Sequence, residues 1–107
     1  MGVMATARAA ATYPHISKDA RICGGKACIE GTRIRVLDIV GLHRQGYKPE
    51  DMLPMYASPL TLAQVHAALA YYYDHPGEIE ASIREGRKAV AQIEREQARL
   101  FKQRRAR

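Results

Sequence analysis

Three cations within one glycine-rich segment are the side chains best suited to binding chemistry. They are Lys26, Arg33 and Arg35, and the hydroxyl of Thr32 lies beside them. Lys and Arg side chains bind phosphate groups, and the guanidinium of Arg can make two parallel hydrogen bonds to one phosphate. We therefore expect these residues to contact a phosphate-bearing partner. The residues leave open two alternatives, an ordinary solvated surface and a pairing of Arg33 with Asp38.

A short β-hairpin is expected to position these cations. Gly24-Gly25 and Glu30-Gly31 are turn signals on either side of a two-residue strand, Cys28-Ile29, and Arg33-Ile34 is the returning strand. The preceding segment, residues 13–17, is the expected pairing partner of Cys28-Ile29.

The sequence contains no recognisable catalytic or metal-binding motif. The carboxylates form no paired motif, and no phosphate loop of the GxxxxGK[ST] type is present. Cys23 and Cys28 lack the two further ligands of a zinc site and the orienting group of a nucleophile pair. We therefore expect no enzymatic activity, no metal and no cofactor, and two packed thiols rather than a disulfide.

Length and charge indicate a single small domain with an anionic partner. The chain has 107 residues and a net charge of +6, with 17 basic and 11 acidic residues. Residues 1–77 carry a net charge of +2 and residues 78–107 a net charge of +4, so the excess lies in the C-terminal part. No apolar run is long enough to span a bilayer, and we expect a cytoplasmic protein with a disordered leader at residues 1–12.

Three short helices are expected after the hairpin. Apolar residues recur at helical spacing over residues 36–42, and Gly46 follows at the C′ position. Pro49 suits the first position of a second helix, which Pro54 should keep short, with its buried face supplied by Met52, Leu53, Met55 and Tyr56. Thr61 and Gln64 form a capping box before a third helix that ends near Asp74.

The arrangement of these helices is typical of a helix-turn-helix domain, in which the start of the later helix enters the major groove of DNA. Thr61 and Gln64 are then the base-facing candidates, and the hairpin cations contact phosphates. The alternative is a purely structural role, because the capping box accounts for Gln64 and residues 62–74 contain no Arg or Lys. Tyr71-Tyr72-Tyr73 are expected at an interface with a second subunit or with the C-terminal helix rather than stacked on bases.

The C-terminal segment, residues 78–107, has the heptad pattern of a helix that packs on a partner. Its seam positions are Ile79, Ile83, Gly86, Val90, Ile93, Gln97 and Leu100. Thirty helical residues extend about 45 Å, which is too long to be buried against so small a domain. The expected partner contacts are Ile79, Ile83, Val90, Ile93, Leu100, Phe101 and Arg104. The alternative is a first half packed on residues 36–74 and a frayed basic end.

Two groups of residues carry a resemblance to a known family. Gly24-Gly25-Lys26, followed by Ile29-x-Gly31-Thr32-Arg33-Ile34, together with residues 60–65 and 67–72, resembles the bacterial family called domain of unknown function 433. The resemblance covers about residues 13–77, and Ala27 departs from the proline that the family usually carries. It implies a VapB-type antitoxin encoded beside a PIN-like ribonuclease toxin.

Together these observations predict a mainly α protein in three parts. Residues 1–12 are the leader, residues 13–77 form a β-hairpin and a helix-turn-helix-like domain, and residues 78–107 form a long amphipathic helix that binds a partner. The expected function is that of an antitoxin in a type II pair, a homodimer that blocks a PIN-like ribonuclease toxin and represses transcription by binding operator DNA. The alternatives are a stand-alone transcription regulator and a protein-interaction module without DNA binding.

Overall fold

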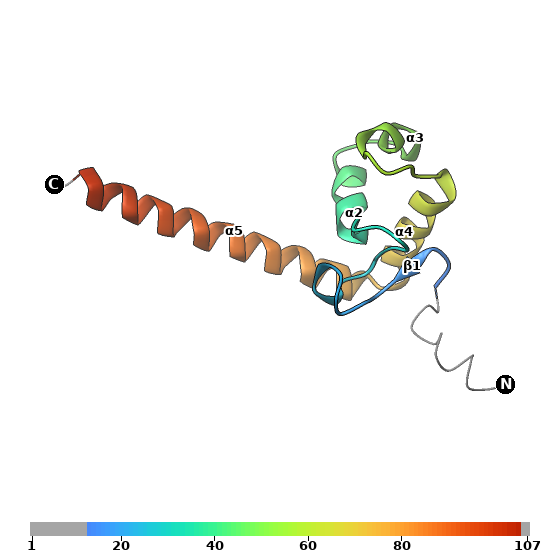
Figure 1. The fold of residues 1–107 in the computed structure, drawn as a ribbon, viewed down its shortest axis with the longest axis horizontal. Coiled ribbons are helices and arrows are strands. Elements are labelled where there is room, and N and C mark those ends of the chain that lie inside the picture. Colours follow the sequence, from blue (N-terminus) through green and yellow to red (C-terminus); the bar gives the residue numbers. More distant parts are fainter. Residues whose placement is uncertain (1–12, 106–107) are drawn as a thin grey trace.

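The protein is mainly helical, with a small N-terminal β-hairpin and one long C-terminal helix (Figure 1). The structure, a computed structural model, describes residues 13–105. Its elements in chain order are β1 (Ile16–Ser17), the 3-10 helix η1 (Cys23–Gly25), β2 (Cys28–Ile29), α2 (Val36–Arg44), α3 (Pro49–Met52), the 3-10 helix η2 (Leu53–Met55), α4 (Leu62–Asp74) and α5 (Pro76–Arg105). The predicted leader lies outside the described residues.

The two strands confirm the expected pairing. β1 and β2 run antiparallel, with Ile16 opposite Ile29 and Ser17 opposite Cys28. The returning segment also joins β2, because the N–H of Ile29 donates to the carbonyl oxygen of Ile34 at 2.8 Å. Gly31 allows the tight turn between them, since its φ of 79° is unfavourable for other residues. The hairpin therefore lies at the positions that the glycines predict.

Helices α2 and α3 begin and end where local signals place them. The carboxylate of Asp38 accepts a hydrogen bond from the backbone N–H of Arg35 at 3.0 Å, which satisfies a donor at the start of α2. Gly46, with φ of 95°, follows the end of α2. Pro54 lies in η2, immediately after the four-residue α3, so the second helix is short as predicted.

Helix α4 has the predicted capping box. The amide oxygen of Gln64 accepts from the backbone N–H of Thr61 at 2.9 Å, and the hydroxyl of Thr61 accepts from the N–H of Gln64 at 3.2 Å. Helix α4 ends at Asp74, and α5 begins two residues later at Pro76. Only His75 separates the two helices.

A small apolar core joins the hairpin to all the long helices. Its fully buried large side chains are Ile29, Val36, Ile39, Val40, Met52 and Val65. Leu53 and Tyr56 are half-buried against this core, as expected. The prediction for Met55 is wrong, because Met55 is 45% exposed. Met55 is the last residue of η2, and the chain becomes extended at Tyr56 directly after it, so no further helical turn covers this side chain.

Helix α5 has two distinct parts. Its first two turns pack on the domain, where Ile79 is 3% exposed and Ile83 is half-buried against the core. The remainder projects away from the domain, and the molecule measures 68 × 34 × 26 Å along its principal axes (Figure 1). The assignment of Ile79 to a partner interface therefore needs correction, because this side chain fills the core of its own domain. No helix among residues 13–105 is long and apolar enough to cross a membrane.

Replacement of Ile39 by Ala tests the position of the core. Removal of a fully buried aliphatic side chain leaves a cavity, so we expect the free energy of unfolding to fall by about 2–5 kcal/mol. The control is Gln92→Ala on the exposed part of α5, which should change it by less than about 0.5 kcal/mol. Urea titration followed by circular dichroism measures both. Equal effects of the two substitutions would contradict this core.

Candidate partner-binding surface

The projecting part of α5 exposes large apolar side chains on one stripe. Val90 is 57% exposed, Ile93 55%, Leu100 50% and Phe101 59%. Val90, Ile93 and Leu100 occupy successive seam positions, and Phe101 lies beside the last of them. A helix that keeps its apolar stripe in water lacks the contacts from which helices in proteins gain most of their stability. This stripe is the strongest candidate for a binding surface.

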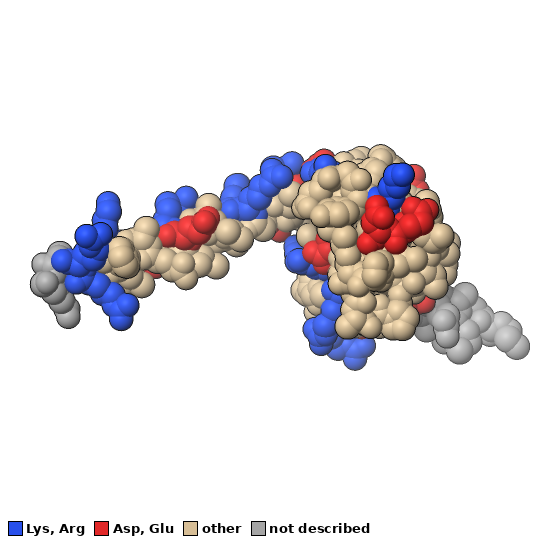
Figure 2. Space-filling view, turned by 90° about the horizontal axis from the view of Figure 1, so that it is seen from above, with Lys and Arg blue, Asp and Glu red and all other residues tan. Residues whose placement is uncertain are grey.

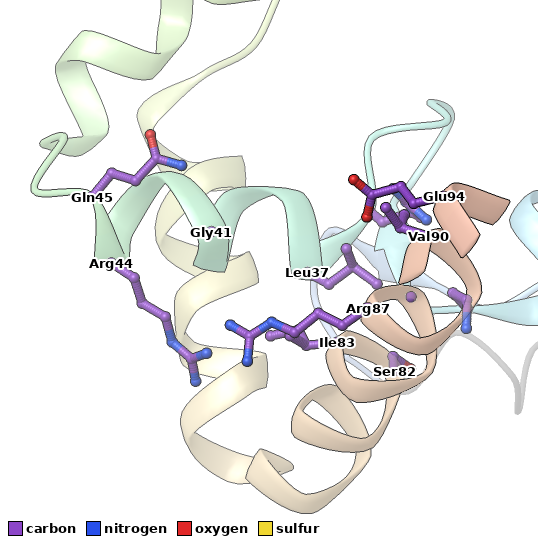
Figure 3. A pocket seen from close by; sticks show the side chains of 12 residues that line it. Leu37, Gly41, Arg44, Gln45, Ser82, Ile83, Arg87, Val90 and Glu94 are labelled. Carbon is purple, nitrogen blue, oxygen red and sulfur yellow. The ribbon is translucent and has the colours of Figure 1, made fainter. Parts of the chain in front are cut away.

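A groove between α2 and α5 continues the stripe toward the domain (Figure 3). It has a volume of about 740 Å³. Leu37 and Gly41 line it from α2, and Ile83 and Val90 line it from α5. Polar side chains surround this apolar floor, among them Lys26, Arg35, Arg44, Arg87 and Glu94. In Figure 3 the side chain of Arg87 extends from α5 toward α2.

The start of α5 is held by a polar cluster that joins α2, α4 and α5. Arg44 of α2 forms an ion pair with Glu80 of α5 and donates a hydrogen bond to the hydroxyl of Tyr72 at 3.0 Å. The same hydroxyl donates to Glu80 at 3.0 Å. The hydrogen bond from Arg44 is the main reason that the pKa of Glu80 lies below its usual range. The cluster fixes the direction in which α5 leaves the domain.

A second cluster holds the junction between α4 and α5. The hydroxyl of Tyr71 donates to Glu78 at 2.8 Å, and its ring stacks on His75 with centroids 4.2 Å apart. Burial, followed by the hydrogen bond to Glu78, raises the pKa of Tyr71. The hydroxyl of Tyr13 donates to Asp74 at 2.6 Å, which ties the start of the described chain to the end of α4. Tyr71 and Tyr72 thus contact the C-terminal helix, one of the two roles expected of the tyrosine run.

Ion pairs within the chain engage two of the three hairpin cations. Arg35 pairs with Asp38 at 2.9 Å, and Lys26 lies 3.7 Å from the carboxylate of Glu85 on α5. Arg33 is exposed, and no ion pair links it to another residue of the segment 13–105. The alternative that paired Arg33 with Asp38 is wrong, because Asp38 lies three residues from Arg35 on the first turn of α2. Arg33 is the cation of this hairpin best placed to meet a phosphate.

The polar side chains expected at bases or phosphates have local structural partners. The hydroxyl of Thr32 donates to the carbonyl oxygen of Ile29 at 2.8 Å and accepts from the N–H of Ile34 at 3.0 Å, so it closes the hairpin turn. Thr61 and Gln64 bond each other at the start of α4. These contacts account for the three residues without a nucleic acid.

The two cysteines are free thiols in different environments. Cys28 is buried, and burial is the first of the causes that raise its pKa to about 12. A thiol with so high a pKa is unreactive near neutral pH, because only the thiolate is nucleophilic. Cys23 is half-buried, and its thiol lies 3.5 Å from the carbonyl oxygen of Arg33. Within residues 13–105 no cluster of three or more His, Cys, Asp and Glu side chains is arranged to hold a metal ion.

Basic side chains follow α5 and gather toward its C-terminal end (Figure 2). Those in the last turn are Lys102, Arg104 and Arg105. Cations at this end also complement the negative end of the helix dipole. The predicted partner contacts Val90, Ile93, Leu100, Phe101 and Arg104 therefore lie on one projecting segment, whereas Ile79 and Ile83 lie at the domain.

Sequence reasoning missed the α2 side of the groove. Leu37, Gly41 and Arg44 belong to a helix whose apolar spacing indicated only a core role. The available signal was Gly41, a residue that weakens a helix by up to about 1 kcal/mol and that leaves a gap on its surface. An added Cβ at Gly41 would meet no atom within 4 Å, so the packing of the domain itself does not require glycine there.

The structure is a small helical domain with one long helix that projects from it. The chain belongs to the family described as protein of unknown function (DUF433), whose model matches residues 16–72. A similar solved structure is that of a DUF433 member from Anabaena variabilis ATCC 29413, with 30% sequence identity and a TM-score of 0.63. The match covers 78% of this chain and 81% of that one. Among curated proteins no sequence matches this chain.

Replacement of Thr61 by Ala separates a structural role at α4 from a binding role. The substitution removes the hydroxyl that accepts from Gln64, so we expect the free energy of unfolding to fall by about 0.5–2 kcal/mol. Thr61→Ser keeps the acceptor and is the matched control. Thermal or urea unfolding measures both variants. An alanine variant as stable as the parent chain would show that the capping hydroxyl contributes nothing.

Proposed function

We propose that this protein is an antitoxin that neutralises a PIN-like ribonuclease toxin through the projecting part of α5. The observation that carries the proposal is the stripe of Val90, Ile93, Leu100 and Phe101, each at least half exposed on a helix that extends beyond its own domain. An amphipathic helix binds by laying such a stripe into an apolar groove of its partner.

The charge of α5 supports a partner with an acidic site. Helix α5 ends in Lys102, Arg104 and Arg105, and the rest of the projecting segment carries further cations. A metal-dependent ribonuclease binds its cation with carboxylates, and an arginine that enters such a site competes with the metal. In this proposal the apolar stripe provides most of the affinity, and Arg104 inhibits the toxin by entering its active site.

Glutamate substitutions within the stripe test the antitoxin proposal. Ile93→Glu with Leu100→Glu places two charges where the toxin would bury apolar surface, so we expect the affinity to fall at least about 100-fold. The measurement is co-expression with the product of the neighbouring gene, followed by co-purification and an assay of ribonuclease activity.

The matched control for this test is Gln92→Glu with Ala98→Glu, which adds the same charge on exposed positions away from the stripe. The control should still bind and inhibit. Inhibition by both double variants would refute the assignment of the stripe, and loss of inhibition in both would indicate an effect of charge alone. A neighbouring product that binds neither variant nor the parent chain would refute the toxin partner.

A second role, binding of operator DNA as an autorepressor, is supported by the exposed guanidinium of Arg33 and the net charge of +6. Arg35 and Lys26 are less suitable for a clean test, because each also holds an ion pair inside the protein. A protein-interaction module without DNA binding is the alternative, and the salt dependence of binding distinguishes the two.

Replacement of Arg33 by Ala tests the contact with DNA. Loss of one phosphate contact should weaken binding to the promoter of its own gene and lower the slope of log affinity against log salt by about 1. The exposed position should leave the unfolding free energy unchanged within about 0.5 kcal/mol. Fluorescence anisotropy at several salt concentrations gives the slope, and Arg33→Lys is the control that keeps the charge. An unchanged affinity would remove Arg33 from the interface.

A further inference from the structure

We propose that two free copies of this chain pair through residues 83–100 of α5, antiparallel and in one register. In that register Arg87 of each copy faces Glu94 of the second copy. This pairing involves only chains that are not bound to another protein, and it does not depend on the antitoxin proposal.

The seam of this pairing lies on the part of α5 that the domain leaves uncovered. From Ile83 the heptad positions continue through Gly86, Val90, Ile93 and Gln97 to Leu100. Ile83 is half-buried and the apolar members beyond it are at least half exposed. Residues 83–100 extend about 27 Å, enough for more than two heptads of interdigitated side chains.

Two glycines that the single chain does not need line the space a second helix would enter. Gly86 of α5 and Gly41 of α2 both line the groove, and an added Cβ at either residue would meet no atom within 4 Å. Each glycine weakens its helix relative to alanine. Close approach of another chain gives both glycines a function, because a Cβ at either position would then occupy the space of the incoming side chains.

Steric fit favours one antiparallel register. Seam positions of one helix face seam positions of the other, so Val90 can lie opposite Ile93 of the second copy. Ile83 then lies opposite Leu100 of the second copy, and Gly86 lies opposite its Gln97. The smallest seam residue thus meets the longest, and the apolar residues meet one another.

Charge complementarity selects the same register. Arg87 and Glu94 flank the seam on the same side of α5, seven residues apart, and in this register they form two symmetric pairs across the dimer. A shift of this register by one heptad in one direction would place Glu94 against Glu94 and Glu96 against Glu96 of the second copy. The same shift in the other direction would place Arg87 against Arg87. A parallel arrangement would place Gly86 opposite Gly86 and Gln97 opposite Gln97, and it would leave Arg87 without a carboxylate.

The groove accommodates the end of the second helix in this arrangement. Leu100 of the second copy lies over Ile83, beside Leu37 and Gly41, in a space of about 740 Å³ that is apolar at its floor. The flanking Phe101 of the second copy then lies near Glu80 and its partner Arg44. An aromatic ring beside a guanidinium is a favourable contact. The groove and the stripe are therefore two halves of one self-complementary surface.

Exchange of the charges at Arg87 and Glu94 in the 107-residue chain tests this inference. Arg87→Glu and Glu94→Arg singly convert two attractive pairs per dimer into two repulsive ones, so each should raise the dimer dissociation constant about tenfold. The variant that carries both substitutions restores opposite charges and should return to within about twofold of the parent chain. Sedimentation equilibrium measures the constants, and circular dichroism confirms that helix content is unchanged.

The control is Arg95→Glu, a charge reversal on the face of α5 opposite the seam, which should change the dissociation constant less than twofold. A parent chain that is monomeric at all accessible concentrations overturns the inference. Single variants that dimerise like the parent, or a double variant that fails to recover, overturn the register. The readout requires no toxin, so its failure is distinct from failure of the antitoxin proposal.

Discussion

The attachment of the first two turns of α5 to the domain is the constraint on which the rest of the structure depends. Ile79 fills the core, and Glu80 on the next position is held by Arg44 and Tyr72. Because an α-helix is stiff over several turns, fixing its first two turns fixes the direction of the whole arm. The arm and the groove beside it therefore have a defined relation, although most of α5 touches nothing else in the chain.

The same attachment pairs two cations of the domain with carboxylates of α5. Arg35, Arg44 and Lys26 each pair with a carboxylate inside the protein, and two of those carboxylates, Glu80 and Glu85, belong to α5. Surface pairs of this kind contribute little to stability individually. Their effect is on position and net charge, because they neutralise the compact part and leave the basic excess at the far end of α5.

Features governed by neighbouring residues could be predicted from the sequence, and features that join distant residues could not. The capping box of Thr61 and Gln64, the short second helix at Pro54 and the turn at Gly31 each depend on a few consecutive residues. The pairing of Arg44 with Glu80 spans 36 positions and depends on how α2 and α5 pack. The groove has the same origin, because it forms only where α2 and α5 lie side by side, and Gly41 is the one residue of α2 whose type hinted at it.

Ile79 shows why the heptad pattern predicts a partner interface that extends too close to the domain. A seam residue of a coiled coil and a core residue of an amphipathic helix have the same type and spacing, so periodicity cannot separate them. The distinction depends on whether another element of the same chain lies against that turn. Ile79 belongs to the core of the domain, whereas Val90 and Ile93 lie outside that core and are more than half exposed.

One stripe on α5 cannot hold two occupants at once, and this links the two proposals. Pairing of two copies through residues 83–100 covers Val90, Ile93 and Leu100, the side chains that a toxin would bury. A toxin must then displace the second copy. The apparent affinity of the chain for the toxin is therefore the intrinsic affinity multiplied by the fraction of chains that are monomeric. The linkage is reciprocal. Toxin binding weakens dimerisation by the same free energy by which dimerisation weakens toxin binding. The number of free copies per toxin would consequently set how much of the stripe is available.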